Sequence, residues 1–422
     1  MTAARIFGRA LRHRNYRLFF SGQSISLIGT WLTRVATSWL VYRLTGSSLL
    51  LGTVGFAGQI PTFLVAPFAG VLVDRWHRHR VLVVTQALAM AQSAALATLT
   101  LTDRITVPWI LALSALQGLI NAFDVPARQS FVSEMLEDRA DLPNAIALNS
   151  SMVNGARLLG PSIAGMLIAA VGEGYCFLVD AVSYVAVIAS LLLMRIPRAS
   201  AVKERPRMST ELVDGFRYVA GFAPIRSVLL LLALVSFMGM PYMVLMPAIA
   251  SRVLHGGAHT LGFLMTASGV GALTGTLYLA SRKSVLGLGR VVAFAATLFG
   301  TGLVAFSLSR AFWLSFALLV PTGLGMMVQM AASNTILQTL ADDDKRGRVM
   351  SFFTMAFFGT VPFGSLFAGV MADAFGPRAT VLVGGVCCIL GAAAFHRALP
   401  GLRDAVRPIY IRLGITSEPP DQ

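Results

Sequence analysis

The sequence predicts an all-α membrane protein with twelve transmembrane helices in two pseudo-symmetric six-helix bundles. Three observations support this fold class. Only 13% of the 422 residues are charged, about half the share that a soluble domain carries. Apolar residues occur in long blocks such as 50–73 and 228–250, and roughly 20 apolar residues cross a bilayer. Basic residues cluster between the blocks, as is typical of the cytoplasmic loops of membrane proteins.

The apolar blocks define the predicted spans, which should be helical because lipid leaves no other partner for backbone polar groups. The spans are 18–42, 50–73, 81–101, 107–127, 143–168, 175–194, 227–251, 259–280, 291–309, 312–335, 349–372 and 379–396. An even count places both termini on one side. Of the 34 Lys and Arg residues, 27 lie in the termini and even-numbered loops and five in the odd loops. Both termini are therefore predicted to be cytoplasmic.

The chain is predicted to have four parts. These are an N-terminal six-helix bundle (1–195), a cytoplasmic linker with an amphipathic helix at 211–219 (196–226), a C-terminal six-helix bundle (227–398) and a cytoplasmic tail (399–422). The two halves repeat, because a shift of 204 residues superimposes several glycines and an aspartate. The aligned pairs are Gly155 and Gly359, Gly160 and Gly364, Gly165 and Gly369, Gly172 and Gly376, and Asp138 and Asp342.

Polar side chains recur at spacings of three and four within several predicted spans, so each set forms one stripe of a helix. They are Gln23, Ser26, Thr30 and Arg34 in the first span, Gln117, Asn121, Asp124 and Arg128 in the fourth, and Ser150, Asn154, Arg157 and Pro161 in the fifth. Asp180, Gln329 and Asn334 are further polar residues in the sixth and tenth spans. These stripes predict a shared, hydrated interior. The alternative is that they only hold helices together.

Charged residues inside spans need partners, because a charge at the bilayer centre costs about 2.5–3.5 kcal/mol. Arg34 is predicted to pair with Asp180, and Asp124 with Arg128 within one helix. Asp124 and Asp180 are the acids within spans that could carry protons. Any proton coupling is therefore expected in the first half.

Several function classes are excluded. The net charge of +15 is spread over short loops rather than a basic domain, which argues against a nucleic-acid partner. No lysine follows a glycine, so the chain has no nucleotide-binding P-loop. It has neither an HExxH motif nor paired CxxC motifs, and no metal site is expected. No nucleophile, base and orienting residue come together in the sequence, so an enzyme is not expected.

The loop after the second span carries a recognisable motif. Gly70, Asp74, Arg75 and Arg78 resemble the cytoplasmic loop signature of the major facilitator superfamily, with His77 where glycine is usual. This resemblance implies the major facilitator fold and a gating role for the four residues.

The fifth span contains Gly160, Pro161 and Gly165, which are similar to the exporter-associated motif of the superfamily, with Ala164 in place of a second glycine. The resemblance implies that a bend here helps to gate export. The strings at 15–22, 123–129 and 144–150 extend the similarity over nearly the whole chain, to the branch of bacterial efflux proteins that resemble the enterobactin exporter. Ser114 stands where the superfamily usually has an arginine, so either Arg157 or Arg34 takes over its role or the coupling differs from that of relatives.

The expected function is that of a secondary active transporter in the bacterial cytoplasmic (inner) membrane. It would export a siderophore-like or drug-like small molecule by alternating access and proton antiport, as a monomer, with the proton gradient as energy source and no cofactor. The coupling residues would be Asp124, Arg128, Asp180, Arg34 and Arg157, and the substrate-binding residues Gln23, Gln117, Asn121, Asn154, Gln329 and Asn334. Uptake symport or lipid flipping on the same fold remains an alternative. A non-transporting scaffold or sensor is another, against which the polar stripes argue.

Overall fold

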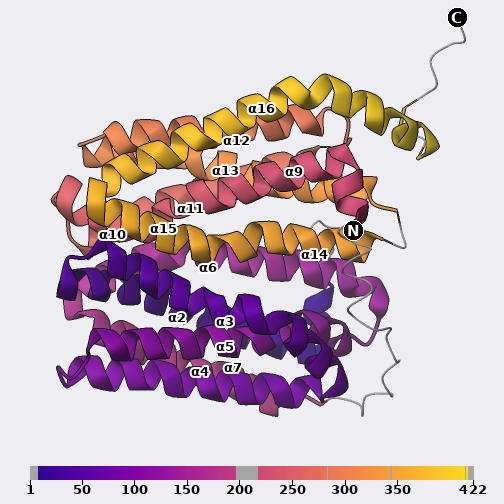
Figure 1. The fold of residues 1–422 in the computed structure, drawn as a ribbon. Helices are drawn as coiled ribbons and strands as arrows, with labels where there is room; N and C mark the ends of the chain where they lie inside the picture. Colours follow the sequence, from indigo (N-terminus) through magenta and orange to yellow (C-terminus); the bar gives the residue numbers. More distant parts are fainter. Residues whose placement is uncertain (1–7, 196–216, 283, 343–344, 414, 417–422) are drawn as a thin grey trace, which may run out of the picture. The chain divides into compact units, whose positions relative to one another are not determined.

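A computed structural model describes residues 8–195, 217–282, 284–342, 345–413 and 415–416, without the side chains of Pro67, Val71 and Asp74. The regular structure within these ranges is helical (Figure 1). Contacts divide the chain into two compact units. The first comprises Met1–Lys203 and Met246–Thr266, and the second Glu204–Leu245 and Ala267–Gln422. The domain boundaries predicted from the sequence stay a prediction, and most of the predicted linker helix at 211–219 lies outside the described residues.

The first unit contains six long helices, drawn in indigo to magenta in Figure 1. They are α2 (Arg14–Thr45), α3 (Ser48–Arg75), α4 (Arg78–Leu101), α5 (Val107–Phe131), α6 (Leu142–Val171) and α7 (Glu173–Leu192). Helix α2 packs on α6 and α7, α3 packs on α5, and α4 packs on α5 and α7. Short connections keep neighbouring helices antiparallel. The Ser47 hydroxyl, for example, caps α3 by accepting a hydrogen bond from the Leu50 N–H at 3.3 Å.

Side chains at the start of α2 bind backbone groups of distant segments. Asn15 donates from Nδ2 to the Arg195 carbonyl at 2.8 Å and accepts from the Arg195 N–H at 3.1 Å. Tyr16 donates from its hydroxyl to the Ala145 carbonyl near the start of α6, at 2.8 Å. Both residues belong to the string 15–22 that carries family resemblance. The string therefore joins three segments at this end of the unit.

The second half of the chain is helical as well, but two of its predicted spans are interrupted. Its elements are α9 (Ala223–Leu234), α10 (Tyr242–Ala248), α11 (Ala258–Ser281), α12 (Leu288–Leu308), α13 (Phe312–Leu340), α14 (Arg346–Thr354), α15 (Thr360–Phe375) and α16 (Pro377–Arg412). The spans predicted as single helices at 227–251 and 349–372 contain π-helical turns at Val235–Gly239, Ile249–Val253 and Met355–Gly359. Hydropathy alone does not register such turns, because the residues in them are as apolar as their neighbours.

Eleven of the described helices are long and apolar enough to cross a membrane. Helix α2 is not among the eleven, although it has 32 residues, because its polar stripe and its arginines lower its hydropathy. The count of twelve therefore stays a prediction. The helix that contains the last predicted span, 379–396, is longer than that span: α16 has 36 residues and continues through Pro400 and Pro408 to Arg412.

Candidate binding cavity

The first unit encloses a small polar cavity between α2, α4, α5 and α7. Its volume is about 60 Å³, enough for a few water molecules. Amide, hydroxyl and charged side chains alternate with apolar ones in its wall. The lining residues are Gln23, Ser26, Leu27, Thr30, Gln86, Ala89, Gln117, Ile120, Asn121, Asp124, Arg128 and Tyr184. Two of the predicted polar stripes, those of α2 and α5, thus face one another across a shared space.

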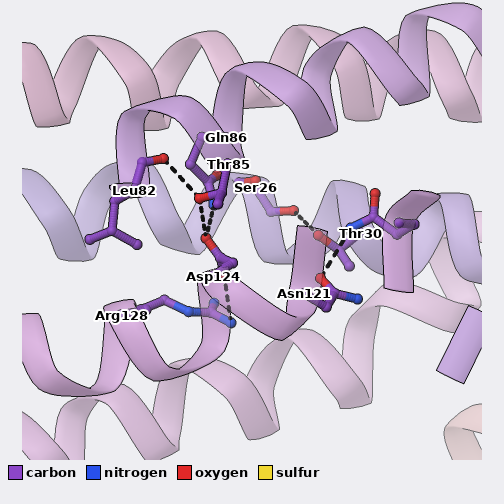
Figure 2. Close-up of polar contacts among 9 residues, drawn as sticks. Ser26, Thr30, Leu82, Thr85, Gln86, Asn121, Asp124 and Arg128 are labelled. Carbon is purple, nitrogen blue, oxygen red and sulfur yellow. Dashed lines mark hydrogen bonds and ion pairs between the residues drawn. The ribbon is translucent and has the colours of Figure 1, made fainter. Parts of the chain in front are cut away.

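Asp124 lies in the cavity wall and is only 5% exposed. Its Oδ1 accepts hydrogen bonds from the Thr85 hydroxyl at 3.0 Å and from Gln86 Nε2 at 2.7 Å. Its Oδ2 lies 3.4 Å from Arg128 Nη2, one turn along α5, which confirms the predicted pair. Figure 2 shows the three partners converging on the carboxylate. Three donors, one of them charged, thus satisfy hydrogen-bond acceptor sites on both oxygens of this buried carboxylate.

Two amides offer hydrogen bonds to a molecule in the cavity. Gln86 uses Nε2 for Asp124, while its buried Oε1 has no partner. Gln117 donates to Asn121 Oδ1 at 3.1 Å. This hydrogen bond fixes the orientation of both amide groups in the cavity wall. A buried polar atom without a partner costs about 1–3 kcal/mol. A bound molecule that donates to Gln86 Oε1 would remove that cost.

Asp180 lies in a second polar cluster, on α7, and is 1% exposed. Its Oδ2 accepts from the Thr33 hydroxyl at 2.6 Å and from the Ser93 hydroxyl at 2.7 Å. The predicted pairing with Arg34 is wrong, because the Arg34 guanidinium lies over the Trp31 ring, 4.9 Å from its centroid. Thr33 faces α7, and the next residue points about 100° further round the helix.

The predicted gating residues between 70 and 78 have different surroundings. Arg78 forms an ion pair with Glu134, which precedes α6. Arg75 is exposed, and a Cβ on Gly70 would meet nothing within 4 Å. The Asp74 side chain is outside the described residues. The ion pair therefore links the start of α4 to the segment after α5.

The predicted gating residues of α6 lie at close helix contacts. A Cβ on Gly160 would be 2.4 Å from Trp31 Cβ on α2. A Cβ on Gly165 would be 3.1 Å from the Cα of Gly262, which belongs to the same unit, and the Pro161 carbonyl faces Gly262 as well. A Cβ at either position would therefore force neighbouring atoms to move. Glycine is therefore required at both positions for α6 to pack this closely.

Several predicted site residues do not join the cavity. Asn154 donates within α6 to the Ser150 carbonyl at 2.9 Å, and Arg157, also on α6, does not line the cavity. Gln329 and Asn334 belong to α13 in the other unit. Gln329 is 1% exposed, and both of its amide atoms lack a hydrogen-bond partner.

The sequence interpretation missed the contribution of α4. Thr85 and Gln86 hold Asp124, and Ser93 holds Asp180. A signal was present, since Gln86 and Ser93 lie seven positions apart in an otherwise apolar segment. Tyr184, one turn after Asp180, was also missed. Among the described residues, no three His, Cys, Asp or Glu side chains lie close enough to hold a metal.

Long apolar helices around an enclosed polar cavity define a multi-pass membrane transporter. A model of the transmembrane secretion effector family matches residues 9–407. The chain therefore belongs to this family, within the major facilitator superfamily.

Relatives of similar length match nearly the whole chain. The staphyloferrin A transporter of Staphylococcus aureus is 26% identical over 384 residues, which cover 90% of this chain and 95% of the relative. The multidrug efflux pump Tap of Mycolicibacterium fortuitum is 27% identical over 388 residues, with 89% and 93% coverage. The macrolide efflux protein A of Streptococcus pyogenes is 21% identical, with 90% and 95% coverage.

Solved structures confirm the fold. The nucleoside transporter NupG superimposes with a TM-score of 0.71 at 14% identity and covers 91% of this chain and 99% of its own. A bacterial homologue of the iron transporter ferroportin superimposes with a TM-score of 0.72 at 16% identity, with 91% and 98% coverage. At such identities the similarity shows the major facilitator fold alone.

Proposed function

We propose that this protein is a secondary transporter that exports a small organic molecule from the bacterial cytoplasm by alternating access and proton antiport. It would act as a monomer in the cytoplasmic membrane, with no cofactor. Family membership and relatives named as efflux proteins support the direction of transport. One proton crossing 100 mV releases about 2.3 kcal/mol. At a potential of about 150 mV this corresponds to roughly a 300-fold gradient of a neutral substrate.

The observation that carries this proposal is the polar cavity around Asp124. Its wall combines an ion pair with an unpartnered amide oxygen on Gln86. Burying such groups in a bundle without a ligand costs free energy that apolar side chains would save. A transported molecule or water that enters this space accounts for their presence.

The chemistry of the cavity suits a molecule with several hydrogen-bonding groups. Its wall offers the amides of Gln23, Gln86, Gln117 and Asn121, and its one ion pair is internally neutral. Arg34 and Arg157 lie outside the wall. Siderophore-like and drug-like molecules, the classes named for the relatives, both carry such groups together with apolar parts.

The efflux test uses ethidium, a macrolide and a citrate-type siderophore in cells that lack their own exporters. We expect efflux of at least one of them to require both the protein and an intact proton gradient, so that a protonophore abolishes it. Asp373→Asn changes an exposed acid in α15. This variant serves as a control for removal of a carboxylate and should transport normally. Protein-dependent accumulation instead of efflux would contradict the direction proposed here, and efflux that resists the protonophore would contradict the coupling.

The proposed orientation places both termini in the cytoplasm, on the basis of the Lys and Arg distribution. It is tested with single cysteines in a background that lacks Cys176, Cys387 and Cys388. In spheroplasts, a membrane-impermeant maleimide should label Asp103→Cys, in the exposed turn after α4, at once. Ser284→Cys, exposed after α11, should react only after lysis. The reverse pattern would invert the topology.

A further inference from the structure

The two membrane-embedded acids of the first unit have opposite surroundings. Asp124 has a guanidinium 3.4 Å away and two neutral donors, and it lines the cavity. The hydroxyl groups of Thr33 and Ser93 both donate to one oxygen of Asp180, Oδ2. Its other oxygen, Oδ1, is buried without a hydrogen-bond partner. The surroundings of Asp124 stabilise a negative charge, whereas those of Asp180 leave half of the carboxylate unsolvated.

We propose that Asp180 carries a proton at neutral pH and is the group whose protonation is coupled to transport; this inference rests on the proton antiport proposed above. A bare carboxylate oxygen in a low-dielectric interior costs several kcal/mol. A proton bound to Oδ1 removes the charge and leaves Oδ2 as the acceptor of both hydroxyls. The O–H bond forms when a proton arrives from water and breaks when the proton returns to water, leaving a carboxylate.

The charged groups on neighbouring helices do not neutralise Asp180. Helix α7 packs on α2, α4 and α6. Helix α4 has no charged side chain from Val81 to Leu101. Helix α2 brings Arg34, which lies over Trp31, and α6 brings Arg157. The carboxylate contacts neither arginine, and its hydroxyl partners come from α2 and α4.

The space around Oδ1 suits a proton better than a metal ion. A Cβ on Gly29 would lie 2.6 Å from Asp180 Oδ1 and 2.6 Å from the Ser183 hydroxyl. Oδ1 is thus pressed against the backbone of α2. A Mg²⁺ or Ca²⁺ ion needs about six or more oxygen ligands around it, whereas a proton needs one oxygen. The absence of a side chain at Gly29 leaves room for the Asp180 carboxyl group.

Tyr184, on the same helix, connects Asp180 to the polar cavity. Tyr184 follows Asp180 by one turn, so both side chains lie on the same face of α7. Tyr184 lines the cavity that holds Asp124. A small displacement of α2 from α7 would uncover Oδ1 beside this wall, because Gly29 is its cover. The site of protonation, Asp180, therefore lies next to the cavity that water would enter.

The direct test is infrared difference spectroscopy on purified full-length protein in detergent, which needs no substrate. We expect a protonated carboxylic acid band at neutral pH that Asp180→Asn removes and Asp373→Asn leaves unchanged. Thr33→Val, which removes one hydroxyl donor, should shift that band, and this readout remains if Asp180→Asn fails to fold. A band that persists in Asp180→Asn, or a position that Thr33→Val does not change, would overturn the assignment.

The transport test uses proteoliposomes, ethidium and an imposed pH gradient. Wild type and Asp373→Asn should pump, whereas Asp180→Asn should lose gradient-driven transport at least tenfold while it still exchanges ethidium down its own gradient. If the wild type moves ethidium without regard to the pH gradient, proton antiport itself fails. If the wild type responds to the gradient and Asp180→Asn responds equally, only the role of Asp180 fails.

Discussion

Gly172 and Gly376 share an unusual backbone conformation at equivalent positions of the two halves. Gly172, before α7, has φ 90° and ψ 172°, and Gly376, before α16, has φ 84° and ψ 156°. Side chains other than hydrogen rarely tolerate this region. The 204-residue repeat predicted from the sequence is confirmed at this pair, because both halves turn between their last two helices in the same way.

Alanine at either glycine should destabilise the protein through backbone strain alone. A Cβ at Gly172 or Gly376 would meet nothing within 4 Å, so no clash contributes. We expect each change to lower the free energy of unfolding by about 1–3 kcal/mol, measured by thermal unfolding of purified protein. Gly155→Ala is the control: its Cβ is equally unobstructed, but Gly155 is helical, and alanine there should stabilise by up to about 1 kcal/mol. Equal effects of the three changes would contradict the strain argument.

The Asp124–Arg128 pair should behave as a coupled unit. Arg128→Gln leaves the carboxylate with two neutral donors, and Asp124→Asn leaves the guanidinium without its partner. We expect the double variant to be less destabilised than the sum of the single ones, with an interaction energy of about 0.5–3 kcal/mol. Unfolding midpoints of the four proteins measure it. Strict additivity would mean that the two charges do not interact.

Gln86 should contribute to substrate binding in addition to holding Asp124. Gln86→Leu removes the unpartnered Oε1 from the cavity wall. The loss of one hydrogen bond, about 0.5–1.5 kcal/mol, corresponds to a rise of roughly 2- to 10-fold in KM for efflux. Gln59→Leu provides the comparison, because Gln59 donates within α3 to the Gly55 carbonyl and does not line the cavity. An equal rise in KM in both variants would remove Gln86 from the binding site.

The Arg78–Glu134 ion pair should tolerate exchange of its charges. Arg78→Glu places two acids together, and we expect at least a threefold fall in the efflux rate. Adding Glu134→Arg should restore most of that rate, since a partly exposed pair contributes through its geometry by about 1 kcal/mol or less. Arg80→Glu, on an exposed arginine two residues further on, should have a smaller effect. If the exchange does not restore transport, the pair is not what links these two segments.

Most helices could be predicted because lipid imposes a simple rule on long apolar runs. The predicted spans at 107–127 and 259–280 differ from α5 and α11 by a few residues at most. The π-turns at Val235–Gly239 and Met355–Gly359 could not be predicted in this way. They depend on packing, as where the Phe237 carbonyl would meet a Cβ on Gly364 at 2.3 Å.

The candidate site was predicted in outline. Stripes with helical spacing placed Gln23, Gln117, Asn121 and Asp124 on faces that meet. The partner of Asp180 could not be chosen correctly, because charge alone favoured Arg34. Which of two adjacent side chains, Thr33 or Arg34, faces α7 depends on the rotation of α2 about its axis. The sequence does not specify this rotation, because α2 has polar residues on more than one face.

The paired hydrogen bonds between Asn15 and Arg195 also bear on biogenesis. They join residues 180 positions apart, one at the start of the first helix and the other just after the sixth. The first bundle therefore cannot close this end until the ribosome has passed Arg195, and once it has, no residue of the second bundle is needed for these bonds. This end of the first half can close in the membrane while the second half is still being synthesised, and truncation just before Arg195 should leave it open to proteases.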